Sequence, residues 1–290
     1  MNNLQKYYQW VCLHLGKRGI VMWHSFVYEK NRGHKPDFNN PKDLTELILS
    51  EMHKDSFLEY AKYADKWEVR KYIESKGLGD ILLDVYGVWD KPENINFDKL
   101  PEKFALKANN GSGNHVFCKD KSTLDKRWAI ERLKKAMSIS DSGYHFEPHY
   151  SHIKPLVYAE ELIDTGTDAW PVDYKFTCLK GEIADVFVCC ERETGKTKYV
   201  TLDTDWNVLP YTKEEYLPVE IPPKPKHLDQ MVKIAKILSA DFDIVRVDLY
   251  EYKDRVYFSE LTFSPWGGQM YSYTNEALRI LGDKYYSIKK

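Results

Sequence analysis

The chain has 290 residues, 43% of them hydrophobic, which is enough to build a core in one large domain or a few closely packed small ones. Its 42 lysines and arginines are balanced by 44 acidic residues, for a formal net charge of -2. The chain therefore lacks the excess of positive charge that binding to a phosphate backbone needs, and nucleic acid is not an expected partner.

The cysteines and the N-terminus indicate the compartment. The five cysteines are odd in number and form no CxxC pair, which predicts reduced thiols and a cytoplasmic protein. The apolar stretch near the N-terminus is interrupted by His14, Lys17 and Arg18, so it is too short for a membrane span or a signal-peptide core. A helix packed on the domain is the favoured interpretation, with a helix lying on a membrane surface as the alternative.

Residues 1 to about 60 are expected to be mainly helical. Within them, Asn40 is the predicted cap and Pro41 the first residue of a helix whose apolar face includes Leu44. A following helix is predicted with Asp65 as its cap and Gly77 at its end.

Two further features of the helical regions are predicted from spacing. Lys66 and Arg70 would share a basic face near the N-terminus of the helix capped by Asp65, and a solvated face is the simpler interpretation. A later helix is predicted over residues 122–138, with Ser122 as its cap and Asp125 three residues on.

A glycine loop follows a predicted strand. Phe104 and Leu106 fall on one face of that strand and Lys107 on the other, so the ammonium group arrives at the mouth of the loop NNGSGN. Backbone N–H groups of this loop can converge on phosphate oxygens, with Lys107 as a compact positive charge beside them. The loop matches neither a Walker A motif nor a dinucleotide fingerprint, and an ordinary hairpin loop is the alternative. The loop residues concerned are Asn110, Gly111, Ser112, Gly113 and Asn114.

A linker and a strand pair follow. The apolar run before Glu160 and Glu161 predicts a strand that leaves the core as a linker, whose backbone could bond an adenine ring. Asp173 and Lys175 share a face of the next strand, where Asp173 could take ribose hydroxyls, although surface acids are the simpler interpretation. The strand pair over residues 171–191 is predicted to turn near Lys180.

A second strand pair, over residues 242–263, carries a candidate metal site. Arg246 and Asp248 share one face of its first strand, and Glu260 and Thr262 share one face of the next. Asp248 meets Glu260 only if the turn has an odd number of residues, as with Tyr252 opposite Val256, or if a strand contains a bulge. Two carboxylates and a hydroxyl placed side by side suit Mg²⁺ bridging substrate phosphates. Two exposed strand acids are the equally weighted alternative.

Three histidines have a loosely metal-like spacing, but no cysteine or matching ligand run completes a zinc site. They are His145, His149 and His152, and satisfied loop histidines are the favoured interpretation.

Seven segments of the chain resemble, in the same order, the TupA-like branch of the ATP-grasp superfamily. They are PKDLTELI, ADKWEVRKYI, INFDKLPEKFALKANNGSGNHVF, PLVYAEELI, DYKFTCLKGEI, TDWNVLP and VRVDLYEYKDRVYFSELTFSPWGG. The resemblance covers about residues 36 to 285, and this branch is encoded with bacterial cell-surface polysaccharide pathways. It implies an α+β, ATP-grasp fold, in which two α+β subdomains clasp a nucleotide, with a helical N-terminal extension. The implied boundaries are 1–100 for the helical region before the ATP-grasp core, 101–162 for the N-subdomain with the glycine loop, and 163–290 for the C-subdomain with the metal site.

The resemblance also implies ATP and Mg²⁺ as cofactors. Lys107 would reach the α- and β-phosphates, Lys66 would support it, and the glycine loop would close over the phosphates. Adenine would bond the Glu161 carbonyl and the Ile163 N–H, and Asp173 would take the ribose. The implied hinge consists of Glu160, Glu161, Leu162 and Ile163.

For the metal, the resemblance implies Asp248 and Glu260 as ligands, while Thr262 stands where many ATP-grasp ligases carry asparagine. The resemblance also implies that three further basic residues meet phosphate or an acidic substrate. They are Lys175, Arg192 and Arg246. The segment SPWGG would help shape the acceptor pocket, with Trp266 as an aromatic surface for a sugar ring.

These expectations together predict an ATP-dependent carboxylate–amine ligase. ATP would phosphorylate the carboxylate, an amine would capture the acyl phosphate, and Arg246 would stabilise the oxygens of the reacting centre. The expected substrates are an amino acid or amine and a uronic acid, or an amino acid and an amino sugar, in surface or capsular polysaccharide biosynthesis near membrane-bound machinery. The alternatives are an ATP-grasp phosphotransferase, a polysaccharide-pathway glycosyltransferase, and a non-catalytic glycan-binding module.

Overall fold

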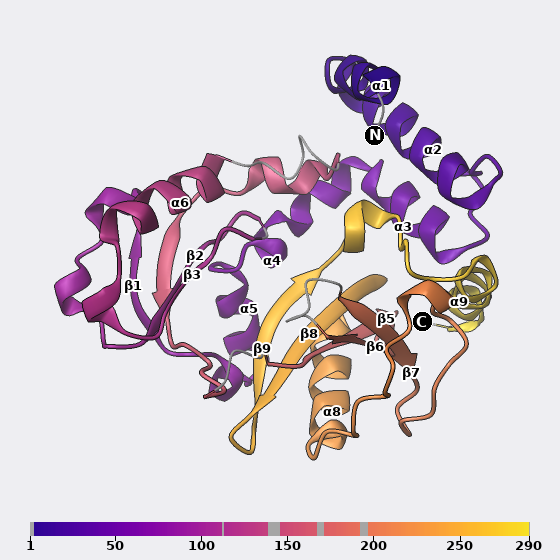
Figure 1. Ribbon diagram of the computed structural model, residues 1–290. Helices are drawn as coiled ribbons and strands as arrows, with labels where there is room; N and C mark the ends of the chain where they lie inside the picture. The colour runs from indigo at the N-terminus through magenta and orange to yellow at the C-terminus, as the bar shows by residue number, and fades with distance from the viewer. Residues whose placement is uncertain (1–2, 112, 139–145, 167–170, 192–196, 290) are drawn as a thin grey trace.

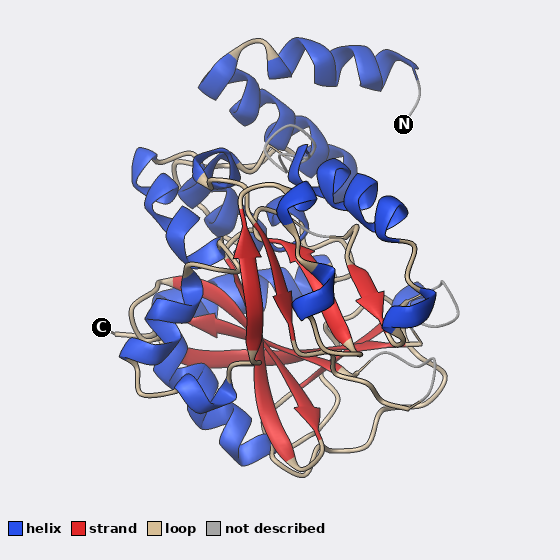
Figure 2. Ribbon diagram, turned by 90° about the vertical axis from the view of Figure 1, so that its left-hand side faces the viewer, coloured by secondary structure: helices blue, strands red, loops and turns tan. Residues whose placement is uncertain are grey.

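The computed structural model describes residues 3–111, 113–138, 146–166, 171–191 and 197–289. Ser112, Arg192 and His145 lie outside the described residues. No helix within the described ranges is long and apolar enough to cross a membrane. The described chain forms two antiparallel sheets with helices around them, and Figures 1 and 2 show the first two helices, Asn3–Leu13 and Gly16–Arg32, extending beyond both sheets.

The N-terminal region is helical, as predicted from the sequence. Its helices are α1 (Asn3–Leu13), α2 (Gly16–Arg32), α3 (Leu44–Met52), α4 (Ala61–Ala64) and α5 (Val69–Ser75). The predicted cap at Asn40 is wrong. Asp43 caps α3 instead, accepting the Glu46 N–H at 2.8 Å, because the chain becomes helical only at Leu44. The Glu46 carboxylate in turn accepts the Lys42 N–H at 2.7 Å, which fixes the entry to α3.

Of the two other predicted helix caps, one is found in the structure and one is not. Asp65 accepts the N–H groups of Trp67 and Glu68 at 2.8 and 3.1 Å, as expected for a cap, although regular α5 begins slightly later. For α6 (Lys126–Ser138) the predicted cap Ser122 is wrong, because Asp125 accepts the Trp128 N–H at 2.9 Å. Ser122 lies in the preceding 3₁₀ turn.

The smaller sheet, sheet A, has the strand order β1-β4-β2-β3. Its strands are β1 (Val85–Trp89), β2 (Phe104–Ala108), β3 (Val116–Cys118) and β4 (Val157–Glu160). Leu106 of β2 and Leu133 of α6 belong to one hydrophobic core, which gives the sheet A lobe a core of its own. The strand β1 lies before the boundary predicted at residue 101 and pairs with β4.

The larger sheet, sheet B, has the order β7-β6-β5-β8-β9. Its strands are β5 (Asp173–Leu179), β6 (Glu182–Cys190), β7 (Lys198–Leu202), β8 (Ile244–Tyr252) and β9 (Arg255–Thr262). Val247 and Leu249 of β8 share a hydrophobic core with Met231 of α8 (Leu228–Ser239) and Leu281 of α9 (Asn275–Ser287). Because side chains alternate along a strand, Arg246 and Asp248 of β8 lie on the face away from α8.

The two predicted hairpins form, but one turn differs from the prediction. The β5–β6 hairpin turns at Lys180 and Gly181, both with positive φ, as expected. The three-residue turn suggested for β8–β9 is wrong: Tyr252 pairs with Arg255, so only two residues form the turn. Both of those residues also have positive φ, which is the geometry of a tight hairpin turn.

The bulge alternative for the second hairpin is confirmed. Leu249 pairs with Phe258 and Asp248 pairs with Glu260, so Ser259 is the additional residue in β9. An additional residue inverts the facing of every residue beyond it. Without it Glu260 would oppose Val247 and face α8; with it, Glu260 and Thr262 lie on the face of Asp248 and Arg246.

Candidate active site

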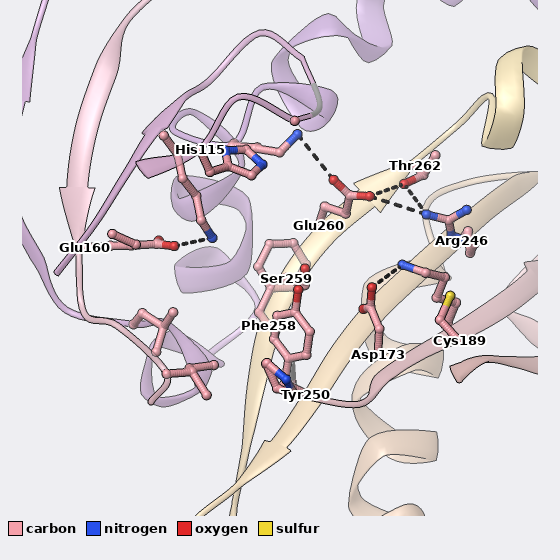
Figure 3. A pocket seen from close by; sticks show the side chains of 18 of the residues that line it. His115, Glu160, Asp173, Cys189, Arg246, Tyr250, Phe258, Ser259, Glu260 and Thr262 are labelled. Atoms are coloured by element: carbon pink, nitrogen blue, oxygen red, sulfur yellow. Dashed lines mark hydrogen bonds and ion pairs between the residues drawn. The ribbon is translucent and has the colours of Figure 1, made fainter. Parts of the chain in front are cut away.

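A cavity of about 670 Å³ lies between the two sheets, and residues from both sheets line it. Lys107 and Glu160 line it from sheet A, and Glu260 and Arg246 line it from sheet B. Figure 3 shows Glu160 on one side and Glu260 and Arg246 on the other side of the space between sheet A and β8–β9. The structure therefore brings together the cations and the acids that the sequence singled out in separate segments.

The cations on the sheet A side are held by acidic and carbonyl oxygens. Lys107 Nζ lies 2.5 Å from Glu160 Oε1 on the neighbouring strand. Lys66 Nζ donates to the Gly111 carbonyl at 2.9 Å and lies 3.2 Å from Glu260 Oε2 across the cavity. Burial by itself lowers the pKa of Lys107, but the acidic groups led by Glu160 outweigh it and leave the pKa raised. Lys107 is therefore a permanent cation at the cavity wall.

The sheet B side holds a compact group of alternating charges. Arg246 binds Asp248 through two bonds of 2.7 Å and also contacts Glu260 Oε1 at 3.3 Å and Thr262 Oγ1 at 3.2 Å. Lys175 lies 2.7 Å from Asp173 and bonds Asp248 from the other side. These pairings follow from the strand register. Lys175 of β5 lies opposite Asp248 of β8, and Arg246 of β8 lies opposite Thr262 of β9.

The charged residues of this group keep one another ionised by shifting their pKa values. Burial alone would raise the pKa of Glu260, but Lys66, Lys175 and Arg246 hold it well below its ordinary range. Burial likewise lowers the pKa of Lys175, yet Asp173 and Asp248 leave it raised. The cavity therefore presents fixed positive and negative charges near neutral pH.

The predicted metal ligands can be compared with this geometry. Glu260 and Thr262 line the cavity, whereas Asp248 is fully buried beneath Arg246 and Lys175 and has no surface on it. Carboxylate and hydroxyl oxygens on adjacent strands suit Mg²⁺, and Asp248 opposes Glu260 directly, so the donor set fits this ion. Participation of Asp248 requires that Arg246 or Lys175 first release its carboxylate.

The predicted hinge lies along one wall of the cavity. Its four residues all line the cavity: Glu160, Glu161, Leu162 and Ile163. The Glu161 N–H donates to the Asp84 carbonyl at 2.8 Å, which turns this peptide toward the loop before β1. Asp173 also lines the cavity, at the start of β5. The wall therefore combines apolar side chains with backbone and carboxylate groups, as a nucleotide would need.

The glycine loop is divided between two roles. Gly113 lines the cavity, and the Gly111 carbonyl binds Lys66. Asn110 is buried and its side-chain amide donates to the Met137 carbonyl of α6 at 3.2 Å, so this side chain anchors the loop. Neither Asn110 nor Asn114 lines the cavity in this arrangement, and Asn114 takes the left-handed conformation with φ 51°.

Several cavity residues were not selected from the sequence. They include His115, Tyr158, Tyr250 and Phe258. His115 directly follows the glycine loop; burial, followed by Lys107 and Lys66, lowers its pKa to about 3, so the imidazole is neutral. Tyr250 lies two residues after Asp248 on the same face of β8, so alternation could have found it. Phe258 lies before the bulge, and its place at the cavity depends on the tertiary structure.

Aromatic residues also line the cavity. Trp266 lines the cavity with φ 50° and meets the rings of Phe187 and Tyr199 edge-on, with centroids 5.2 and 5.6 Å away. A tryptophan in the left-handed conformation is strained and is expected where the surrounding structure holds it. The buried Arg32 of α2 supplies such support, since it donates to the carbonyls of Gln269 and Met270 at 2.6 and 2.9 Å.

The histidines do not form a metal centre in the described part of the chain, where no group of three or more His, Cys, Asp and Glu side chains gathers to hold a metal ion. His149 is fully buried, with its ring 4.9 Å edge-on from Phe57, and among the described residues neither of its ring nitrogens has a hydrogen-bond partner. His152 is exposed.

With this geometry established, the chain can be compared with known proteins. The family described as TupA-like ATPgrasp matches residues 44–286. No curated protein matches the chain.

Solved structures of ligases also match. D-alanine–D-alanine ligase from Helicobacter pylori is 16% identical, with 79% of this chain and 59% of that chain covered and a TM-score of 0.46. The Bacillus anthracis enzyme complexed with ATP is 16% identical, with 84% and 64% covered and a TM-score of 0.46. The ATP-grasp ligase PsnB complexed with a precursor variant, Mg and ADP is 13% identical, with 84% and 66% covered and a TM-score of 0.44. The chain thus spans about three fifths of the length of these proteins.

Proposed function

The chain belongs to the TupA-like ATP-grasp family, a membership that supports an ATP-dependent ligase, and we propose that it joins a carboxylate to an amine. In the first step a carboxylate oxygen attacks the γ-phosphorus of ATP, the bond to the β–γ bridging oxygen breaks, and ADP leaves. In the second step the amine nitrogen attacks the carbonyl carbon of the acyl phosphate. The bond from carbon to the phosphate oxygen then breaks, phosphate leaves with the electron pair, and the amine loses a proton.

One observation carries this proposal. The cavity gathers four cations from both lobes beside the carboxylates of Glu160, Asp173 and Glu260, and the Lys66–Glu260 contact of 3.2 Å spans the gap. The cations are Lys66, Lys107, Lys175 and Arg246. Such a set is preorganised for a polyphosphate, because an anion entering the cavity can replace protein carboxylates as the partner of each cation.

The positions of three of these cations support a role for each. Lys107, at the hinge wall, would hold the inner phosphates, and Lys66 would meet the phosphates from the side of the glycine loop. Arg246, which lines the cavity beside Glu260 and Thr262, would donate to the oxygens of the acyl phosphate and of the tetrahedral intermediate. Mg²⁺ bound by Glu260 and Thr262, with Asp248 behind them, would offset the charge of the transferring phosphoryl group.

The substrate class is proposed from the aromatic residues that line the cavity. Trp266, Tyr199 and Tyr271 are among them, and aromatic faces of this kind suit the apolar face of a sugar ring. We therefore propose a uronic acid joined to an amino acid or amine, or an amino acid joined to an amino sugar, for a surface or capsular polysaccharide. A cytoplasmic site of action is part of the same proposal.

The experiment measures ADP release with Mg²⁺ and ATP across a panel of uronic acids, each with and without amino acids. We expect ADP release that depends on both an acid and an amine, with a product whose mass equals their sum less water. Release that needs only an acceptor hydroxyl would instead indicate a phosphotransferase.

Two variants test the site itself. Lys107→Ala and Glu260→Ala are each expected to lower the rate at least about 100-fold, because each removes a charge that faces the reacting phosphates. Turnover at the parent rate in both variants would show that the cavity is not the active site. A shift of the melting temperature by Mg²⁺-ATP, lost in Lys107→Ala, checks nucleotide binding without a substrate.

A further inference from the structure

The hairpin of α1 and α2 has a surface unlike the rest of the described chain. Large apolar side chains that are exposed cluster on it: Leu4, Tyr7, Trp10, Leu13, Leu15 and Met22. The exposed fraction reaches 75% for Leu4 and 56% for Trp10. Figures 1 and 2 show α1 at the outer end of the molecule, away from both sheets. We call these six residues the apolar edge.

The apolar edge is not the side on which α1 packs. Tyr8 and Cys12 of α1 face α2, where they join a small core with Trp23 and Phe26. Residues on a helix are spaced by about 100°, so Tyr7 and Trp10 lie on the opposite side from Cys12 and Leu4 lies on the flank between Tyr7 and the packed side. The hairpin thus already satisfies its own packing, and the apolar edge faces outward.

Charge distinguishes this surface from the rest of the chain. The first 28 residues include Lys6, Lys17 and Arg18 and no acidic residue, so they carry a formal charge of +3 in a chain whose net charge is -2. All three basic side chains are exposed, and the tip of the hairpin places Lys17 and Arg18 beside Leu13 and Leu15. Lys17 also forms an exposed pair with Asp55 at 2.7 Å, a contact of little energetic weight.

We propose that the apolar edge docks this protein onto an anionic lipid surface. Tryptophan, tyrosine and leucine beside lysine and arginine are the residues that lie at the boundary between headgroups and acyl chains. Around α1, Lys6 projects between Leu13 and Trp10, where a dry protein contact would bury its ammonium group. At a lipid surface the same side chain reaches the headgroup phosphates while its neighbours enter the acyl boundary. The 11-residue α1 is too short to span a bilayer, so the hairpin lies on the surface.

The test is flotation of the full chain with two vesicle preparations, phosphatidylcholine alone and a mixture of phosphatidylcholine with phosphatidylglycerol. We expect binding to the mixed vesicles, weaker binding to the neutral ones, and loss of binding at high salt because the electrostatic part is screened. Lys6→Gln and Arg18→Gln should each weaken binding to the mixed vesicles about fivefold, and Lys233→Gln on α8 should not change it.

Trp10→Gln and its matched control separate the surface from general stickiness. Trp10 on α1 and Trp128 on α6 are both about half exposed, so neither substitution should alter the fold. Trp10→Gln should lower vesicle binding about tenfold or more, and Trp128→Gln should leave it unchanged. Equal binding of both variants, or no binding of the parent to mixed vesicles, overturns the proposal. A parent dimer that Trp10→Gln converts to a monomer, without vesicle binding, would assign the surface to a second copy and also overturn it.

Discussion

The two sheets that face each other across the cavity are built differently. The sheet A lobe has a small core of its own around Leu106 and Leu133 and contributes Lys107 and Glu160 to the cavity. The sheet B lobe has the larger core, which continues into the N-terminal helices and α9, and it carries the buried group around Asp248.

This difference separates two physical tasks. A charge group as dense as the one on sheet B needs a rigid scaffold, because each buried charge is costly unless its partners stay in place. The sheet A lobe carries fewer charges, and Lys66, between α4 and α5, binds both the Gly111 carbonyl of the glycine loop and Glu260 of sheet B, a contact that a ligand can replace. The comparison therefore predicts that damage to sheet B affects folding and chemistry together, whereas damage to sheet A affects them separately.

Arg246→Met should have the largest effect. It removes the two-bond partner of the fully buried Asp248 carboxylate, and we expect a loss of about 3–5 kcal/mol of unfolding free energy, together with loss of ADP release. Urea denaturation of the variant measures it. Arg255→Met, on an exposed part of the same hairpin, is the control and should stay within about 0.5 kcal/mol of the parent. A stable Arg246→Met protein would show that the charge group does not depend on Arg246.

Leu106→Ala and Leu249→Ala test whether the lobes have independent cores. Both side chains are fully buried, and each truncation should cost about 3 kcal/mol. Because the cores are separate, we expect Leu106→Ala to give a first calorimetric transition for the sheet A lobe alone, while Leu249→Ala lowers the transition of the larger lobe. A single transition that shifts equally in both variants would contradict the comparison.

Lys107→Gln should change activity more than stability. Its side chain is 22% exposed and its partner Glu160 is 8% exposed, so the unfolding free energy should fall by about 1–3 kcal/mol, while ADP release should fall about 100-fold. Lys99→Gln, an exposed lysine of the same lobe, should leave both unchanged. If Lys107→Gln instead unfolded the protein, its main role would be to neutralise Glu160.

His149→Phe should have the smallest effect, a change in how the unfolding free energy depends on pH. Burial lowers the pKa of His149 to about 3, below the ordinary 6.5, so between these values the unfolded chain binds a proton that the folded chain does not. The stability from neutral His149 is complete above about pH 6.5 and is lost as the pH falls, at about 1.4 kcal/mol per pH unit. Urea denaturation near pH 7 and near pH 5 should show a shallower fall for His149→Phe than for the parent. Equal slopes would place a proton-accepting partner near His149.

Local chemistry in the sequence was enough to predict much of the fold. The turn at Lys180 and Gly181 follows from the short polar stretch between two alternating apolar runs, and the capping role of Asp65 follows from its position three residues before Glu68. The cap at Asp43 was missed, because Asn40 and Asp43 are both good caps and only the packing of Leu44 on the core decides between them. The roles of the candidate site residues stay predictions.

The amino-acid sequence by itself determined which strands carry the charged residues, where the two hairpins turn, and to which family the chain belongs. These properties depend on residues that are close together along the chain. Only the tertiary structure decided that Ser259 is a bulge, that Asp248 is covered by Arg246 and Lys175, and that His115 and Phe258 face the same cavity. The physical reason is that register and burial depend on the partner strand and the opposite lobe. A one-residue shift in β9 moves Glu260 between the cavity and the core without changing a single residue type.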